Sequence, residues 1–136
     1  MRGKIILFES RLLLVQAVIE EKDNLKLVKT IPVLKDSFAK FKGTVAVPKE
    51  ALTNELGPFC LLMFSTVHIT TSDFKVVGEL VDMNILKTIE EIHKKGSAKG
   101  FDKGIRDDLY QQEEILNLDN WAFASSLRSF HAFDIL

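Results

Sequence analysis

The first thirty residues alternate apolar runs with short polar breaks. The apolar runs lie within residues 5–8, 11–21 and 25–31. The polar breaks between them are Glu9-Ser10-Arg11 and Glu21-Lys22-Asp23-Asn24. Polar clusters of this kind are typical of turns between strands. The pattern therefore predicts a three-strand meander over about residues 4–31. A helix over 11–22 is the alternative, because a long apolar run does not by itself distinguish a buried strand from a buried helix.

The next segment changes its spacing. Leu34, Phe38 and Phe41 recur at helical intervals, which predicts a short helix or an irregular crossing over residues 34–42. Thr44–Val47 reads as a brief strand. Pro48 suits the first position of a helix, so residues 48–56 are predicted to form one or two helical turns.

Residues 59–71 give the strongest strand signal of the chain. A continuous apolar run, residues 59–64, is followed by an alternation in which residues 67, 69 and 71 lie on one face and residues 66, 68 and 70 on the other. A polar turn at 71–73 then leads to a second apolar segment, residues 74–81. We predict that these two segments pair as a hairpin in the centre of the sheet.

The C-terminal third switches to a period of about 3.6 residues. Asp82 is a plausible N-cap, and Ile85, Ile89 and Ile92 form one apolar stripe of a helix that ends near Gly96. Two further helices are predicted over residues 106–118 and from Asp119 or Asn120 onward. The expected fold class is α+β: a single domain, residues 1–136, whose antiparallel sheet has about five strands, mainly within residues 4–81, with two or three C-terminal helices packed on one face.

Composition and charge exclude some classes of protein. The 136 residues are 46% hydrophobic and 27% charged, which excludes a disordered chain, a collagen and a disulfide-knotted miniprotein. The formal net charge is −1, so no steering field of one sign surrounds the molecule. The charge is uneven, however: residues 1–48 hold nine basic and five acidic residues, and residues 49–136 hold nine and fourteen.

Targeting signals and cysteines bear on the compartment. Cys60 is the only cysteine, so no internal disulfide can form. The apolar stretch near the N-terminus breaks at Glu9, and no signal-peptidase pattern follows it. No run of eighteen apolar residues occurs. We therefore expect a cytoplasmic protein that does not contact a membrane.

The residues that carry chemistry form no established motif. Cys60 lies inside an apolar strand, where a buried structural thiol is expected. The three histidines lack the spacing of metal ligands, so no metal and no cofactor is predicted. His93 stands near a helix end, where the helix dipole accounts for it. His68, with Asp73 at the adjacent turn, is the first candidate if the protein is an enzyme with a scattered site.

Lysines of the first half raise a nucleic-acid alternative. The candidate residues are Lys22, Lys26, Lys29, Lys35, Lys40 and Lys42, with Phe38 and Phe41 available to stack on bases. The sequence pI of about 6.3 lies well below that of typical nucleic-acid binders, so this partner is unfavoured.

An acidic segment and nearby aromatic residues favour a protein partner. Residues 107–119 hold five acids and no base, and Trp121 follows them. The predicted partner-binding residues are Asp107, Asp108, Glu113, Glu114, Asp119 and Trp121. The leading hypothesis is a small non-enzymatic protein that binds, and neutralises or regulates, a protein with a basic surface. Toxin-neutralising immunity proteins and adaptors are comparable by analogy of type only. A homodimer through a sheet edge is an alternative.

Overall fold

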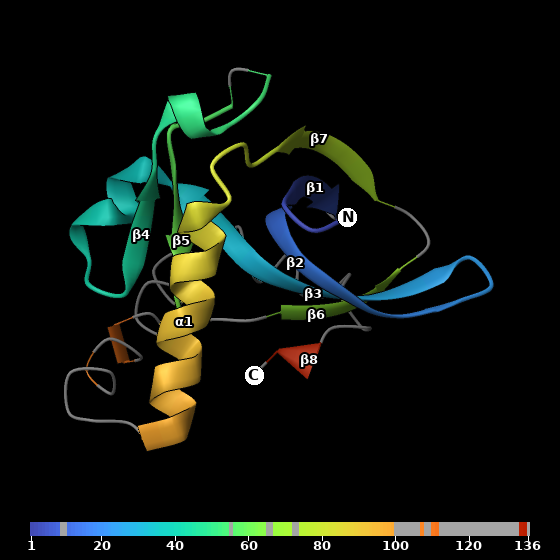
Figure 1. The fold of residues 1–136 in the computed structure, drawn as a ribbon. Coiled ribbons are helices and arrows are strands. Elements are labelled where there is room, and N and C mark those ends of the chain that lie inside the picture. The colour runs from blue at the N-terminus through green and yellow to red at the C-terminus, as the bar shows by residue number, and fades with distance from the viewer. Residues whose placement is uncertain are drawn as a thin grey trace.

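Within the part of the chain that the structure describes, an antiparallel sheet and the helix α1 (Asn84–Lys99) make up the fold (Figure 1). The computed structural model describes residues 1–8, 11–54, 56–64, 67–71 and 74–99, together with 107, 110, 111, 134 and 135. The strands are β1 (Lys4–Phe8), β2 (Arg11–Lys22), β3 (Leu25–Lys35), β4 (Thr44–Val47), β5 (Phe59–Leu62), β6 (Val67–Thr71), β7 (Lys75–Glu79) and β8 (Asp134–Ile135). Their order is β4-β5-β3-β2-β1-β7, with β6 beside β3 and β8 beside β6. The α+β class is confirmed.

The N-terminal meander is confirmed, and the alternative helix over 11–22 is wrong. β1, β2 and β3 pair in sequence, with Ile5 opposite Leu14 and Leu14 opposite Ile31. Both faces of β2 are buried here, because Leu13 and Leu14 belong to clusters on opposite sides of the sheet. A strand covered on both faces has a continuous apolar sequence, which explains why its pattern was ambiguous.

β3 is flanked on one side by two successive strands. Its end, Val33 to Lys35, pairs with β5, and its earlier part, residues 26–30, pairs with β6. The predicted strand over 59–71 thus lies along β3 as an interrupted strand, with a turn at Met63 and Phe64. The sheet therefore has more strands than the five expected.

The predicted hairpin of residues 59–71 with 74–81 is wrong. β7 pairs with β1, placing Val76 opposite Ile6, whereas β6 lies between β3 and β8. Phe74 marks the crossing from β6 to β7: it packs on a buried cluster formed by Ile6, Leu13, Val15, Val28 and Ile69. Burial of this aromatic ring favours the crossing over a tight turn back.

The helical predictions need correction. The described residues contain one α-helix, α1 (Asn84–Lys99), rather than two or three. The segments predicted as the other helices lie outside the described residues, apart from positions 107, 110 and 111, which are helical. In residues 34–42 and 48–56, the described helical residues form the 3₁₀ helices η1 (Asp36–Lys40) and η2 (Lys49–Ala51), and residues 34 and 35 belong to β3. The helical spacing of Phe38 and Phe41 reflects their packing on Leu34, Cys60 and Leu62.

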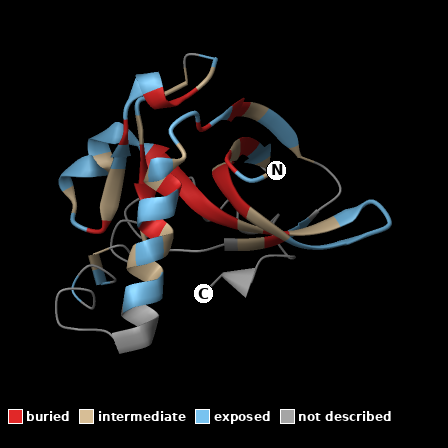
Figure 2. Cartoon of the chain, in the orientation of Figure 1, coloured by how far each residue is buried: buried red, intermediate tan, exposed pale blue. Residues whose placement is uncertain are grey.

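Helix α1 covers one face of the sheet (Figure 1). The Asp82 carboxylate accepts a hydrogen bond from the backbone N–H of Asn84 at 3.1 Å, which supports its predicted capping role. Leu86 and Ile89 are fully buried against Ile5, Leu14 and Ile31. Burial is concentrated where the sheet passes under α1, and the far end of β2 and β3 is exposed (Figure 2). No described helix is long and apolar enough to cross a membrane.

Candidate functional site

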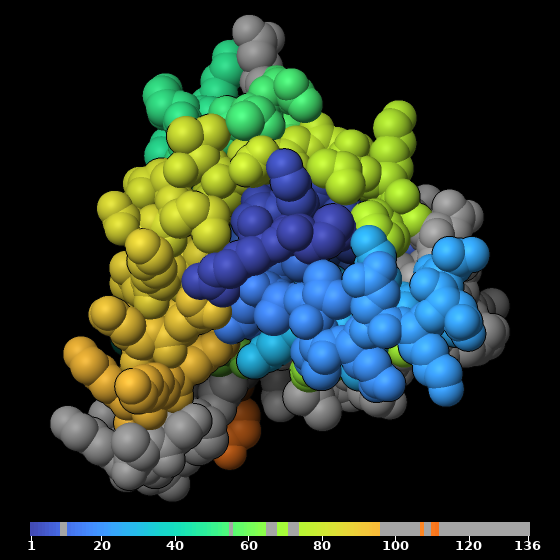
Figure 3. All heavy atoms as spheres, turned by 45° about the vertical axis from the view of Figure 1, so that its right-hand side comes forward, coloured from blue at the N-terminus to red at the C-terminus, as the bar shows by residue number. Residues whose placement is uncertain are grey.

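The outer parts of β2 and β3 project beyond the core beneath α1 (Figure 1). We refer to residues 16–29 as the arm. In the space-filling view the arm, in blue, stands at the surface to one side of the helix, in yellow and orange (Figure 3). β6 lies beside β3 along the arm, with Lys26 opposite Thr71 and Lys29 opposite His68. The arm thus consists of parts of β2 and β3, with β6 beside β3 and with β2 at the edge.

Beyond Gln16, the outer edge of β2 has no strand partner among the residues that the structure describes. β1 pairs with β2 only up to Leu14, and beyond it the Gly3 N–H donates to the Val15 carbonyl at 2.9 Å. The Arg2 guanidinium then donates to the Gln16 carbonyl at 3.1 Å. From residue 17 to residue 22, no described residue pairs with β2 on this side. An open strand edge presents backbone N–H and C=O groups to solvent.

Two β-bulges shape the arm. The register of β2 against β3 shifts between Val15 and Ala17, and again between Val18 and Glu20. Ile19, at the second bulge, has 52% of its surface exposed, and Leu25 beyond the turn has 50%. Bulges increase local twist and redirect side chains. The arm therefore presents two large apolar side chains to solvent.

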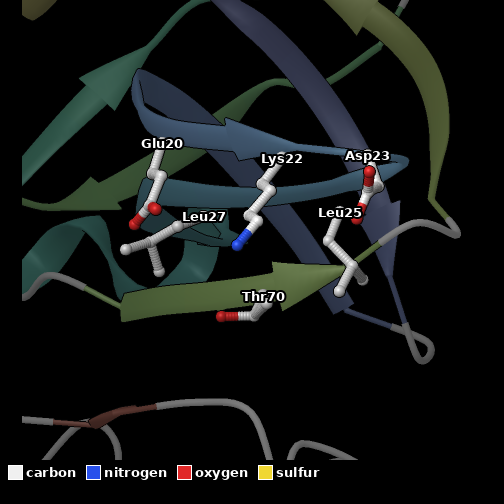
Figure 4. Close-up of a pocket in the computed structure, with 6 residues that line it drawn as sticks. All are labelled: Glu20, Lys22, Asp23, Leu25, Leu27 and Thr70. Atoms are coloured by element: carbon white, nitrogen blue, oxygen red, sulfur yellow. The ribbon is translucent and has the colours of Figure 1, made fainter.

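A shallow hollow lies on the arm. It has a volume of about 220 Å³ and is lined by Glu20, Lys22, Asp23, Leu25, Leu27 and Thr70. Figure 4 shows Lys22 between the two leucines, with Thr70 below them on β6. Ligand pockets for small molecules usually measure about 300–1,000 Å³. This hollow is smaller, and a single side chain of a partner matches it better than a substrate or cofactor.

The charged side chains of the arm differ in whether they have a partner of opposite charge. Lys26 lies 3.8 Å from the Glu21 carboxylate and 5.7 Å from the centre of the Phe74 ring. Lys29 lies close enough to Glu90 on α1 to contribute to the low pKa of that carboxyl. Glu20 and Glu21 are both exposed on the edge strand. The edge strand therefore carries Glu20, Glu21 and the exposed Lys22, and Glu21 is ion-paired with Lys26 of β3.

A polar cluster, Arg2, Gln16 and Glu90, fixes the base of the arm to α1. Arg2 forms a bidentate ion pair with the Glu90 carboxylate, and one of its two contacts measures 2.8 Å. The buried Gln16 amide also donates to that carboxylate at 3.0 Å. The hydrogen bond from Arg2 is the main reason that the pKa of Glu90 is lowered, and the bond to Glu90 raises the pKa of Arg2. The cluster joins the N-terminus, β2 and the helix.

His68 lies beside the arm, on β6, and its predicted partner is outside the described residues. It is half-buried in β6, opposite Lys29 of β3 and Asp134 of β8. Its side chain makes no hydrogen bond to any residue that the structure describes. Asp73 is not among those residues. The pairing of His68 with Asp73 therefore stays a prediction.

Cys60 is a structural residue, as predicted. Its side chain is fully buried, and its thiol donates to the Lys35 carbonyl at 3.3 Å. Burial, with a smaller contribution from Asp36, raises the pKa of the thiol to about 11. A thiol that stays protonated is a poor nucleophile.

His93 has a different role from the one predicted. α1 continues to Lys99, so His93 lies six residues before the helix end, beyond the reach of the dipole effect. Its Nε2 forms a hydrogen bond with the Met63 carbonyl, and its ring centre lies 5.9 Å from that of Phe64. His93 therefore links α1 to the turn between β5 and β6. No local sequence signal indicates this contact, because the residues are thirty positions apart.

The lysines proposed for nucleic-acid binding do not share one stripe. Lys22 lines the hollow, Lys26 and Lys29 face acidic groups, and Lys40 lies 5.5 Å from the Phe41 ring centre near η1. The rings of Phe38 and Phe41 stack on each other at 6.3 Å and pack against a buried cluster. They are therefore engaged within the fold.

Most of the predicted partner-binding residues lie outside the described part of the chain. Asp107 is described and exposed. Asp108, Glu113, Glu114, Asp119 and Trp121 are not described. The arm, in contrast, was not predicted as a site, although the turn cluster at 21–24 marked its tip. Among the described residues, no group of three or more acidic, histidine or cysteine side chains could hold a metal ion.

Comparison with protein-family models, curated proteins and solved structures finds no match to this chain. The arm, the hollow and the polar cluster at its base are therefore the observations from which a function is inferred.

Proposed function

We propose that the protein is a non-enzymatic binding domain that acts by engaging another protein through the arm. The observation that carries this proposal is the exposure of Ile19 and Leu25 on the projecting arm, where Leu25 lines the hollow. Exposed large apolar side chains gathered at one place are typical of protein interfaces. The affinity of an interface usually depends on a few such side chains. They fill small pockets on the partner, or they line a hollow that a side chain of the partner fills.

The charge of the arm suggests the character of the partner. Glu20 and Glu21 are exposed beside the apolar residues, and Asp23 lies at the tip. A partner with a basic surface would complement these acids, and the electrostatic attraction would increase its association rate. The acidic residues predicted from the sequence, from Asp107 to Asp119, would extend the same preference. A cytoplasmic role in neutralising or regulating such a partner is part of this proposal.

Site-specific photo-crosslinking tests the proposal. A photoreactive phenylalanine analogue replaces Ile19 in one variant and Val81 in the control, which is 61% exposed and lies next to α1 rather than on the arm. Both variants are expressed in the native source, irradiated and treated with nuclease. We expect the arm variant to yield one defined crosslinked protein, abolished by Leu25→Ser. Equal labelling of both variants, or crosslinks only to nucleic acid, would refute the proposal.

A further inference from the structure

We infer that the open edge of β2, residues 17–22, binds an extended basic segment of the partner as an additional β-strand. This inference rests on the proposed function, because it specifies how the arm engages its partner. Strand addition requires backbone N–H and C=O groups that are held in an extended conformation, and β2 supplies them. Its other side is paired with β3 from Ala17, opposite Lys29, to Lys22, opposite Leu25. Extended peptides bind to sheets by this mode through backbone hydrogen bonds.

The opening begins where the chain's own contacts end. Gly3 and Arg2 occupy the carbonyls of Val15 and Gln16, and residues 17–22 follow without a described neighbour on that side. Residues 19–22 are exposed, so an added strand does not need to displace a described element. The ion pair of Arg2 with Glu90 holds the start of this edge against α1.

Side chains of the edge select a basic segment. Glu20 and Glu21 are adjacent, so in a strand they point to opposite faces of the sheet. Glu20 lies opposite Leu27 and lines the hollow, and Glu21 lies opposite Lys26, with which it forms a partly exposed ion pair at 3.8 Å. Two adjacent basic residues of an added strand would face these two acids in turn. The first of these basic side chains would lie on the same face of the sheet as Glu20, and its charged group would meet the Glu20 carboxylate.

A second copy of this chain is the less suitable occupant. Two-fold antiparallel pairing of β2 with β2 centred between Glu20 and Glu21 places these residues of the two copies opposite one another, and a centre between Ile19 and Glu20 leaves the two Glu20 residues diagonal neighbours. Like charges opposite one another destabilise strand pairing, and natural edges use charge in this way against self-association. The same glutamates favour a strand with lysine or arginine at those positions.

The test uses a hexapeptide probe in which two adjacent lysines are flanked by valine and threonine. Matched probes carry two glutamates instead, or keep the lysines but have N-methylated backbone amides. Each is titrated into the full-length, ¹⁵N-labelled protein, with chemical shifts and amide exchange as readouts. We expect the lysine probe to shift and protect residues 17–22. The glutamate probe should bind about fivefold more weakly, since each charged cross-strand pair contributes modestly. The N-methylated probe should not protect the edge.

Variants of the protein complete the test. Combining Glu20→Gln with Glu21→Gln should weaken the lysine probe about fivefold. Glu50→Gln, at an exposed position in η2, serves as the control and should leave binding unchanged. Equal affinity of the lysine and glutamate probes, binding that tolerates N-methylation, or shifts confined to other strands would overturn the inference. A concentration-dependent dimer that protects residues 17–22 without peptide would overturn it in favour of a second copy. If Ile19 crosslinks a partner but no peptide protects the edge, strand addition fails and the proposed function stands.

Discussion

The polar cluster at the base of the arm makes a sharp prediction for Glu90→Ala. The substitution removes the acceptor of the Gln16 amide, whose residue is only 6% exposed, and leaves that buried donor without its partner. An unsatisfied buried polar group costs about 1–3 kcal/mol. The lost ion pair with Arg2 adds about 0.5–1 kcal/mol, because the two side chains are 42% and 30% exposed and solvent screens them. We expect Glu90→Ala to lower the free energy of unfolding by about 2–3 kcal/mol.

Glu91→Ala is the matched control. Glu91 is the next residue of α1 and is exposed, so both variants gain the same helix propensity from alanine. The control should change the free energy of unfolding by less than about 0.5 kcal/mol. Urea denaturation at pH 7, followed by circular dichroism, measures both. Adding Gln16→Leu to Glu90→Ala should recover part of the loss, because it removes the orphaned amide.

The pH dependence gives an independent check. Folding lowers the pKa of Glu90 below its ordinary value of 4.5, mainly through the hydrogen bond from Arg2. The charged carboxylate therefore stabilises the fold above about pH 4.5, and this contribution is lost as the pH falls through the lower, folded pKa. The difference between the wild type and Glu90→Ala should narrow from pH 5 toward pH 3. Two results would refute the conclusion that this cluster fixes the arm to α1. One is an equal free energy of unfolding for Glu90→Ala and Glu91→Ala at pH 7, and the other is a difference between wild type and Glu90→Ala that does not change with pH.

Three further predictions concern the core and the N-terminus. Leu86→Ala, at a fully buried position of α1, should lower the free energy of unfolding by about 2–5 kcal/mol in urea denaturation, and a loss below 1 kcal/mol would contradict its burial in the core. Cys60, with a thiol pKa of about 11, should resist iodoacetamide at pH 8 in the folded protein and react once urea unfolds it; rapid labelling of the native protein would show that the thiol is accessible. Gly3→Ala should lower the melting temperature, because Gly3 has φ of 86° and a Cβ there would lie 2.8 Å from the Met83 sulfur; an unchanged melting temperature would mean that both the backbone and Met83 adapt freely.

Local pairings were predictable from the sequence, and distant ones were not. The meander of β1, β2 and β3 follows from apolar runs and the turn clusters between them, since each pairing joins neighbouring segments. The pairing of β7 with β1 depends on which strand edge is left open after β6 is enclosed by β3 and β8. No periodicity within residues 74–81 carries that information. The same holds for Arg2 and Glu90, which are 88 positions apart.

The candidate site illustrates the same limit. The cluster at residues 21–24 marked a turn, but no pattern in β2 indicated that its outer part lacks a neighbour. Openness of an edge is a property of the whole sheet, because it depends on where β1 ends. Cys60 could be placed in the core from its apolar surroundings alone, and the structure confirms this. His93 could not, because its acceptor is the carbonyl of a distant turn.

The topology of the sheet has a consequence for synthesis on the ribosome. The meander is complete once residue 35 has been made, but its two outer strands remain without neighbours. β3 must wait for residues 59–71, and β1 must wait for β7, which ends at Glu79. At about 5–20 residues per second, that interval lasts roughly 2–9 s. Until residue 71 has been made, a nascent sheet with apolar side chains such as Ile6, Leu13 and Val28 on one face is uncovered at both borders, and the border at β1 stays uncovered until Glu79. The nascent chain is therefore a natural substrate for holding chaperones, and its yield on overexpression should depend on their supply.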